Sequence, residues 1–166
     1  MWQWYAIGYL FSVLVGHFFV AMVADQMWQS IGWKPAKSAR FRPDAWQPRV
    51  LGVIERFLYT SSLLVGKAEF IGFWLAVKVA GQWKRWSEDQ ESDGVHVSGR
   101  SIYQNFLIGN GLSILFSIVG YKLIEWLPQR KYTEALCVPV SLMALTMIIY
   151  FWIRRSDAEK PELSGR

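Results

Sequence analysis

The segment formed by residues 50–83 is apolar enough to enter a membrane, yet it carries five charged side chains. These side chains are Glu55, Arg56, Lys67, Glu69 and Lys78. On insertion scales, a fixed charge at the centre of a membrane helix costs about 2.5–3.5 kcal/mol. Such a charge therefore faces a protein interior, a partner or water. This segment constrains the fold more strongly than any other part of the chain.

The spacing of these charges predicts a helical hairpin. Residues 66–69 divide the segment almost evenly and contain its one central glycine. Counted from Lys67, Glu55 lies about twelve residues back and Lys78 about eleven residues on, which at about 1.5 Å per residue places both charges at a similar depth. We expect Glu55 and Lys78 to neutralise each other, with Lys67 and Glu69 in the exposed turn.

Three further segments contain no Asp, Glu, Lys or Arg over about the length that a bilayer helix needs. They cover residues 5–23, 102–121 and 135–153. Together with the hairpin they predict an all-α fold, a polytopic integral membrane bundle of about five membrane segments. Residues 1–155 then form a single helical transmembrane domain, residues 87–99 a flexible acidic loop, and residues 156–166 a short disordered cytoplasmic tail.

The distribution of Lys and Arg between the loops predicts the orientation. If residues 50–83 cross the membrane twice, one side receives Lys34, Lys37, Arg40, Arg42, Arg49, Lys84, Arg85, Arg100, Arg154, Arg155, Lys160 and Arg166. The other side receives Lys67, Lys122, Arg130 and Lys131. If residues 50–83 crossed the membrane only once, the basic residues would be distributed almost equally between its two sides. Because Lys and Arg accumulate in cytoplasmic loops, the first arrangement is favoured, with the N-terminus outside and the C-terminus in the cytoplasm. A re-entrant hairpin gives the same polarity and stays open as an alternative to two tilted spans.

The net charge of +5 does not indicate nucleic-acid binding, because the basic residues lie just beyond the predicted helix ends. This placement is typical of contact with anionic lipid headgroups at cytoplasmic loops. The partners that the sequence predicts are therefore the lipid bilayer and its anionic headgroups. No nucleic acid is expected.

Small residues at every fourth position predict helix-packing faces in three segments, since small side chains allow backbones to approach closely in lipid. The residues concerned are Gly8, Ser12, Gly16, Gly72, Ala76, Gly109, Ser113 and Ser117, with Ala68 and Ala80 extending the second series. The partner helix could belong to the same chain, to a second copy or to another membrane protein. The sequence leaves this choice open.

Polar side chains inside the predicted helices are the candidate site residues. They are Glu55, Arg56, Lys78, Asn105, Asn110 and His17. One interpretation is an ion or proton path, or an anionic headgroup site built on the two basic residues. The favoured interpretation is a structural ion pair near the cytoplasmic interface, with long side chains reaching water. For the two asparagines and the histidine we expect polar contacts between helices.

No metal, cofactor or catalytic role is expected. His17 has no second His or Cys at ligand spacing, and Cys137 is predicted to be a small packing residue. The chain contains none of the common hydrolase, metalloprotease or phosphate-loop motifs. A lipid-modifying enzyme therefore ranks third among the functions considered.

Three strings resemble those of small bacterial inner-membrane proteins without an assigned function. They are GVIERFLY at residues 52–59, WLAVKVA at 74–80 and FLIG at 106–109. The resemblance covers about residues 50–120 and implies a bacterial membrane location but no activity. The first function hypothesis is a small membrane protein that acts by assembly, as a subunit, anchor or self-associating effector. The alternative is an oligomeric channel or transporter with a charged path at Glu55, Arg56 and Lys78.

Overall fold

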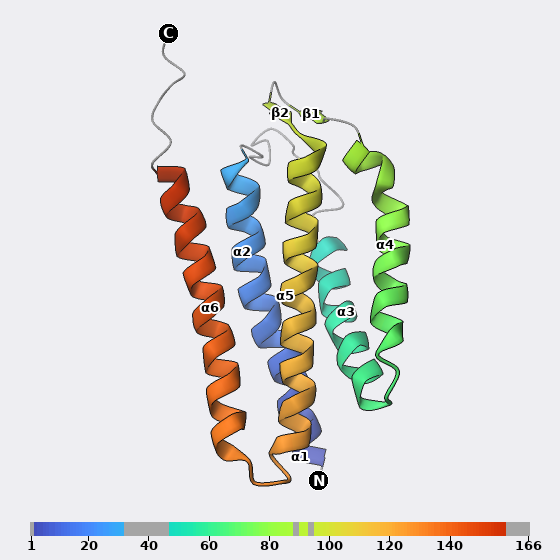
Figure 1. Ribbon diagram of the computed structural model, residues 1–166, viewed down its shortest axis with the longest axis vertical. Coiled ribbons are helices and arrows are strands. Elements are labelled where there is room, and N and C mark those ends of the chain that lie inside the picture. The colour runs from blue at the N-terminus through green and yellow to red at the C-terminus, as the bar shows by residue number, and fades with distance from the viewer. Residues whose placement is uncertain (1, 32–46, 88–89, 93–94, 159–166) are drawn as a thin grey trace.

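The computed structural model describes residues 2–31, 47–87, 90–92 and 95–158, and its long elements are all helices (Figure 1). They are α1 (Trp2–Leu10), the π-helix η1 (Phe11–Val15), α2 (Gly16–Ser30), α3 (Gln47–Leu64), α4 (Glu69–Ser87), α5 (Gly99–Trp126) and α6 (Tyr132–Ala158). Two short antiparallel strands, β1 (Gln90–Ser92) and β2 (Val95–Val97), lie in the segment predicted to be a flexible loop.

Three helices are long and apolar enough to cross a membrane. The first joins α1, η1 and α2 into one helix from Trp2 to Ser30, and the other two are Gly99–Trp126 and Tyr132–Ser156. They contain the three uncharged segments, so the all-helical fold and three helices able to span a membrane are confirmed. The count of five membrane segments stays a prediction, because α3 and α4 are not among these three helices.

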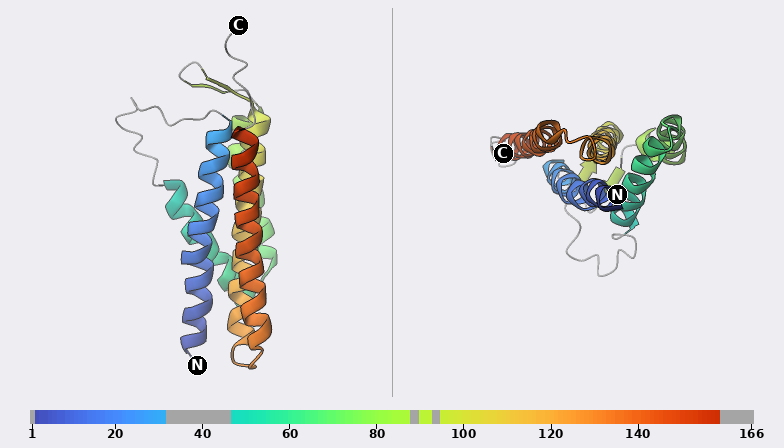
Figure 2. Two further views of the ribbon diagram at one scale, coloured as in Figure 1. Left: turned by 90° about the vertical axis from the view of Figure 1, so that its left-hand side faces the viewer. Right: turned by 90° about the horizontal axis from the view of Figure 1, so that it is seen from below.

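Helix α5 is the centre of the bundle, since it contacts every other helix. The N-terminal end of α1 and the C-terminal end of α6 lie at opposite ends of the molecule, and α3 and α4 form a hairpin beside α5 (Figure 1). The turn of this hairpin points towards the same end as the start of α1 (Figure 2, left). The hairpin predicted from the central glycine is therefore present, with α3 shorter than the three apolar helices.

The hairpin turn owes its shape to Gly66. This residue has a φ of 70°, in the left-handed region that glycine adopts without steric cost. The backbone N–H of Lys67 donates to the carbonyl of Ser62 at 2.8 Å, and that of Gly66 donates to Leu63 at 3.2 Å. These bonds satisfy the last carbonyls of α3, as is usual where a helix ends at a glycine.

Two glycines bring the first helix and α5 into close contact. A Cβ atom at Gly8 would lie 2.5 Å from the carbonyl oxygen of Gly120. A Cβ atom at Gly120 would lie 2.7 Å from the carbonyl oxygen of Gly8. Neither position has room for a side chain, which is the arrangement expected for small residues at a membrane helix interface. Apolar contacts also form part of the core, where buried Phe11 packs on buried Phe116.

The π-helical segment helps to align the small residues of the first helix. In an ideal α-helix, four residues advance about 400°, so each small residue would lie about 40° beyond the previous one. The wider turn of a π-helix, with i→i+5 hydrogen bonds, reduces this overshoot. Gly8, Ser12 and Gly16 are accordingly all buried, although they extend over two turns.

The predicted cytoplasmic tail is partly helical. Helix α6 continues to Ala158, past the predicted start of the tail at residue 156. Residues 159–166, and the basic residues Lys34, Lys37, Arg40 and Arg42 between α2 and α3, lie outside the described residues.

Candidate functional site

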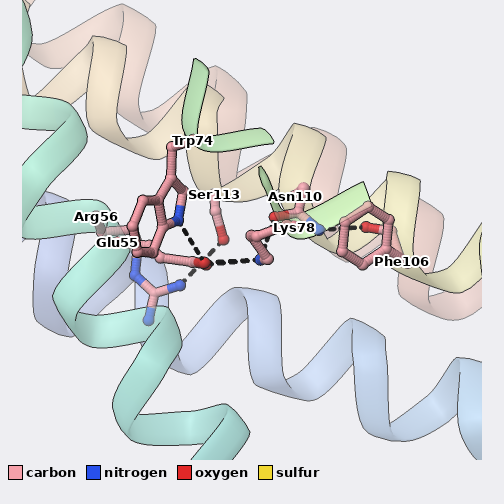
Figure 3. Close-up of polar contacts among 7 residues, drawn as sticks. All are labelled: Glu55, Arg56, Trp74, Lys78, Phe106, Asn110 and Ser113. Carbon is pink, nitrogen blue, oxygen red and sulfur yellow. Dashed lines mark hydrogen bonds and ion pairs between the residues drawn. The ribbon is translucent and has the colours of Figure 1, made fainter. Parts of the chain in front are cut away.

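Glu55 and Lys78 form a buried ion pair between α3 and α4 (Figure 3). The Lys78 Nζ atom lies 2.7 Å from Glu55 Oε1 and donates a hydrogen bond to Oε2 at 3.0 Å. Only 4% of the Glu55 side chain and 17% of the Lys78 side chain are exposed. The sequence predicts this pair, because Glu55 and Lys78 lie at similar distances from the hairpin turn. The structure shows that the two charges do meet.

Both members of the ion pair have further partners. Trp74 Nε1 donates to Glu55 Oε1 at 2.9 Å, and Lys78 Nζ donates to Asn110 Oδ1 at 2.7 Å. Asn110 in turn donates from Nδ2 to the carbonyl of Phe106 at 2.7 Å, and the Lys78 ammonium lies 5.1 Å from the centre of the Phe106 ring. This polar network joins α3, α4 and α5, as Figure 3 shows.

The position of the ion pair along its helices differs from the predicted one, while its depth in a membrane stays a prediction. The sequence places each charge about five residues inside a helix end, near the interface. In the structure, α3 begins at Gln47 and α4 continues to Ser87, so Glu55 and Lys78 lie near the middle of their helices. The difference arises because both helices continue beyond the apolar run into polar residues. The two head groups bind each other inside the protein, with most of both side chains buried.

Arg56 is a buried cation without a carboxylate partner among the described residues. It is 1% exposed. Its Nη1 donates to Ser113 Oγ at 3.1 Å, and its Nη2 donates to His17 Nδ1 at 3.1 Å. A guanidinium has only donors, so the His17 Nδ1 atom accepts in this contact. The Nε atom of Arg56 is buried and has no hydrogen-bond partner among the residues that the structure describes.

Three hydroxyl groups and the backbone of Arg56 form a second polar layer beside the guanidinium. Ser12 Oγ lies 2.8 Å from Thr60 Oγ1, and Ser12 and Ser117 donate to the carbonyl of Arg56 at 3.5 and 3.4 Å. Ser117 also donates to the carbonyl of Ser113 at 2.9 Å. These side chains connect the first helix, α3 and α5 deep inside the bundle.

The remaining candidate residues lie apart from this cluster. Asn105 has a buried Nδ2 atom that lacks a partner within the described part of the chain, as does the buried hydroxyl of Tyr59. A Cβ atom added at Gly72 or Gly109 would meet no described atom within 4 Å, and Ala76 is exposed. Lys67 and Glu69 form an exposed pair at 4.0 Å in the turn, as expected.

Cys137 corrects one expectation, because it is exposed on α6 and is not a buried packing residue.

Sequence reasoning also missed Trp74, Phe106, Thr60 and Gly120 as parts of the polar and close-packed regions. Trp74 had a detectable signal, since it lies in mid-helix while the other tryptophans that the structure describes lie near helix ends. The described part of the chain contains no group of three or more His, Cys, Asp or Glu suited to a metal ion.

The fold and the cluster define an all-helical protein with three helices able to span a membrane and a buried ion-pair network at its centre. Comparison with known proteins finds no matching protein-family model, no matching curated protein and no matching solved structure.

Proposed function

We propose that this chain is a small multi-span membrane protein that acts through helix packing and assembly, as a subunit, anchor or self-associating effector. One observation carries the proposal: the small-residue face of α4 is open. Gly72, Ala76 and Ala80 on α4 are all exposed, as is Ala68 in the turn before it. In contrast, the small residues of the first helix are buried against α3 and α5.

The buried ion pair fixes which face of α4 is open. Trp74 and Lys78 both bind Glu55 on α3, and Lys78 also binds Asn110 on α5. These contacts turn one side of α4 inwards, so the side with Gly72 and Ala76 faces outwards. An open face of small residues in a membrane is the surface that a second helix packs against.

Cysteine cross-linking in native membranes tests this proposal. With Cys137 replaced by Ser, Gly72→Cys is expected to give a covalent dimer when a short thiol cross-linker is added. Leu145→Cys is the matched control, since Leu145 is 49% exposed on α6 and belongs to no small-residue series. Equal cross-linking at both positions, or none at Gly72, would contradict a specific α4 contact between copies. A single product of another mass from Gly72→Cys would indicate a different membrane protein as the partner.

We further propose a bacterial inner membrane as the location, with the N-terminus outside. The resemblance to bacterial proteins supports the membrane type, and the helix directions support the polarity. Lys84, Arg100, Arg154 and Arg155 belong to helix ends on the side where α6 ends, which would contact anionic headgroups (Figure 1). Lys67, Lys122, Arg130 and Lys131 belong to the opposite side.

An oligomeric channel or transporter is the second candidate. It is favoured by the position of Glu55, Arg56 and Lys78, which are buried or largely buried near the middle of their helices. Charged residues at such depth often line ion or substrate paths. Ion flux into liposomes containing the purified protein, abolished by Glu55→Gln but retained in Lys67→Gln, would support this candidate. Liposomes without flux would exclude it.

A further inference from the structure

We propose that the open face of α4 binds a second copy of this chain, in a parallel pair related by a two-fold axis along the membrane normal. This inference rests on the proposed function and names the partner of the same face. Helix α4 lies at one edge of the bundle (Figure 1; Figure 2, right), where Gly72, Ala76 and Ala80 are exposed. A two-fold interface between identical copies must be self-complementary, because the same surface serves on both sides. The charges and the shape of this face both meet that requirement.

The charges are Lys67 and Glu69, at the start of the open face. Lys67 Nζ and Glu69 Oε1 lie 4.0 Å apart, and 71% and 73% of the two side chains are exposed. Glu69 begins α4 and lies about two helical turns before Ala76, so it belongs to the same side of the helix. The ion pair within one copy is therefore loose and open, and both of its groups are accessible to further charges.

A two-fold axis beside this turn brings two such ion pairs together with alternating sign. The positive-inside rule applies equally to every copy, so the α4 helices of two copies in one membrane run parallel and their turns lie at the same level. Each Glu69 carboxylate then lies between its own Lys67 and Lys67 of the second copy. The two exposed ion pairs complement each other, and no charge of another protein is needed.

The shape of the face consists of a ring beside a gap. Phe73 is 65% exposed, while a Cβ atom at Gly72 would meet no described atom within 4 Å. These consecutive residues lie about 100° apart around α4, on opposite sides of the line from Glu69 to Ala76. A two-fold rotation about the membrane normal places the Phe73 side of one copy against the Gly72 side of the other, at the same height. Each ring thus packs over the small residues of the other copy, where the backbones approach closely.

Association between two differently tagged full chains, co-expressed in one membrane and solubilised in a mild detergent, tests this pairing. Wild-type chain recovered through one tag should carry the other tagged form with it. Lys67→Glu or Glu69→Lys, present in both tagged forms, should lower this recovery by about tenfold, because several exposed charge contacts, each worth up to about a factor of five, become repulsive. Lys122→Glu is the matched control, since it disrupts the ion pair with Glu125 on α5 and leaves α4 unchanged.

The decisive sample combines Lys67→Glu in one tagged form with Glu69→Lys in the other. Two carboxylates on one copy then face two ammonium groups on the other, so recovery should return to the wild-type level. A loss caused by damage to the start of α4 would persist in this mixed sample. Recovery that stays low here, or single variants that associate as well as the wild type, would overturn the two-fold pairing.

Gly72→Leu tests the shape of the face separately. The added side chain fills the gap that receives Phe73 of the second copy, so recovery should be lost, while no described atom of its own copy lies within 4 Å of the new Cβ. Gly81→Leu is the matched control, because Gly81 lies on α4 about 180° around the helix from Gly72. A Cβ atom there also meets no described atom within 4 Å. Equal recovery from the two variants would contradict the packing of Phe73 on Gly72.

The combined results separate this inference from the proposed function. A covalent dimer through Gly72→Cys, together with unchanged recovery of the charge variants, would overturn the two-fold arrangement and leave assembly through α4 standing. A single cross-linked product of another mass would replace the second copy with a different membrane protein. No cross-linked product, together with no recovery of the wild type, would overturn both.

Discussion

Lys78 and Glu55 are 23 residues apart in the chain, yet their side chains meet at 2.7 Å and fasten α4 to α3. The same ammonium binds Asn110 at 2.7 Å, so one lysine connects three helices. Because Lys78 makes all of these contacts, we expect substitution of this one residue to weaken the packing of the hairpin.

Removal of Lys78 alone is expected to destabilise the protein strongly. Lys78→Met leaves the Glu55 carboxylate buried without its cation, which in buried pairs costs about 3–5 kcal/mol. The double variant Glu55→Gln with Lys78→Met should recover much of this loss, since no charge is then stranded. The free energy of unfolding in detergent checks both variants, with Lys67→Met as the exposed control. Losses that simply add would show that the two charges do not depend on each other.

Trp74→Phe is expected to destabilise the hairpin by about 1.5–3 kcal/mol, the usual range for a hydrogen bond to a charged group. The substitution removes the bond from Nε1 to Glu55 while keeping an aromatic ring. Trp152→Phe is the control, because Trp152 is 72% exposed. Chemical or thermal unfolding followed by circular dichroism gives both values. Equal effects would mean that the bond to Glu55 adds nothing to stability.

Gly8→Ala should destabilise the protein by about 1–3 kcal/mol, as overpacking does in other close-packed interiors. The added methyl group would overlap the carbonyl of Gly120 and the side chain of Ile124, so the helices must separate. Gly109→Ala should be neutral, because no described atom lies within 4 Å of a Cβ at that position. Thermal midpoints of the two variants measure the difference, and similar midpoints would rule out a specific Gly8–Gly120 contact.

Accessibility of a cysteine at the hairpin turn is expected to report its side of the membrane. In a Cys137→Ser background, Lys67→Cys and Lys131→Cys should react with an impermeant thiol reagent from outside, and Lys84→Cys only after permeabilisation. This follows from the positive-inside rule applied to the helix directions. Reaction of Lys67→Cys only after permeabilisation would place the turn on the cytoplasmic side, opposite to the prediction. If it stayed unreactive even then, a buried, re-entrant turn would replace the two-span interpretation.

The sequence predicts much of this fold because membrane helices follow length and charge. Three uncharged segments of bilayer length lie within the three apolar helices, and Gly66 marks the hairpin turn. The partnership of Glu55 with Lys78 follows from residue counting alone, since helices of equal rise bring equal distances from a turn to equal depth.

Other features depend on how each helix is rotated about its axis and on which helices pack against it. Counting residues along the sequence predicts neither. Trp74 binds Glu55 because it lies one turn from Lys78 on the same face of α4. The sequence does not predict in which direction its ring points. The contact of Arg56 with His17 and Ser113 required the crossing of three helices at one level. The position of the ion pair along α3 and α4 was misjudged because both helices continue into polar residues, where hydropathy no longer marks the helix ends.

The short length of α3 has a consequence for the surrounding bilayer. Its 18 residues extend about 27 Å, while the helix from Trp2 to Ser30 has 29 residues and extends about 43 Å. In the proposed arrangement with two hairpin spans, lipids beside α3 would meet a lower apolar wall than lipids beside the long helices, and they would thin locally to match it. A protein with such an uneven perimeter would be sensitive to acyl-chain length. Its stability should change with membrane thickness even where no protein contact changes.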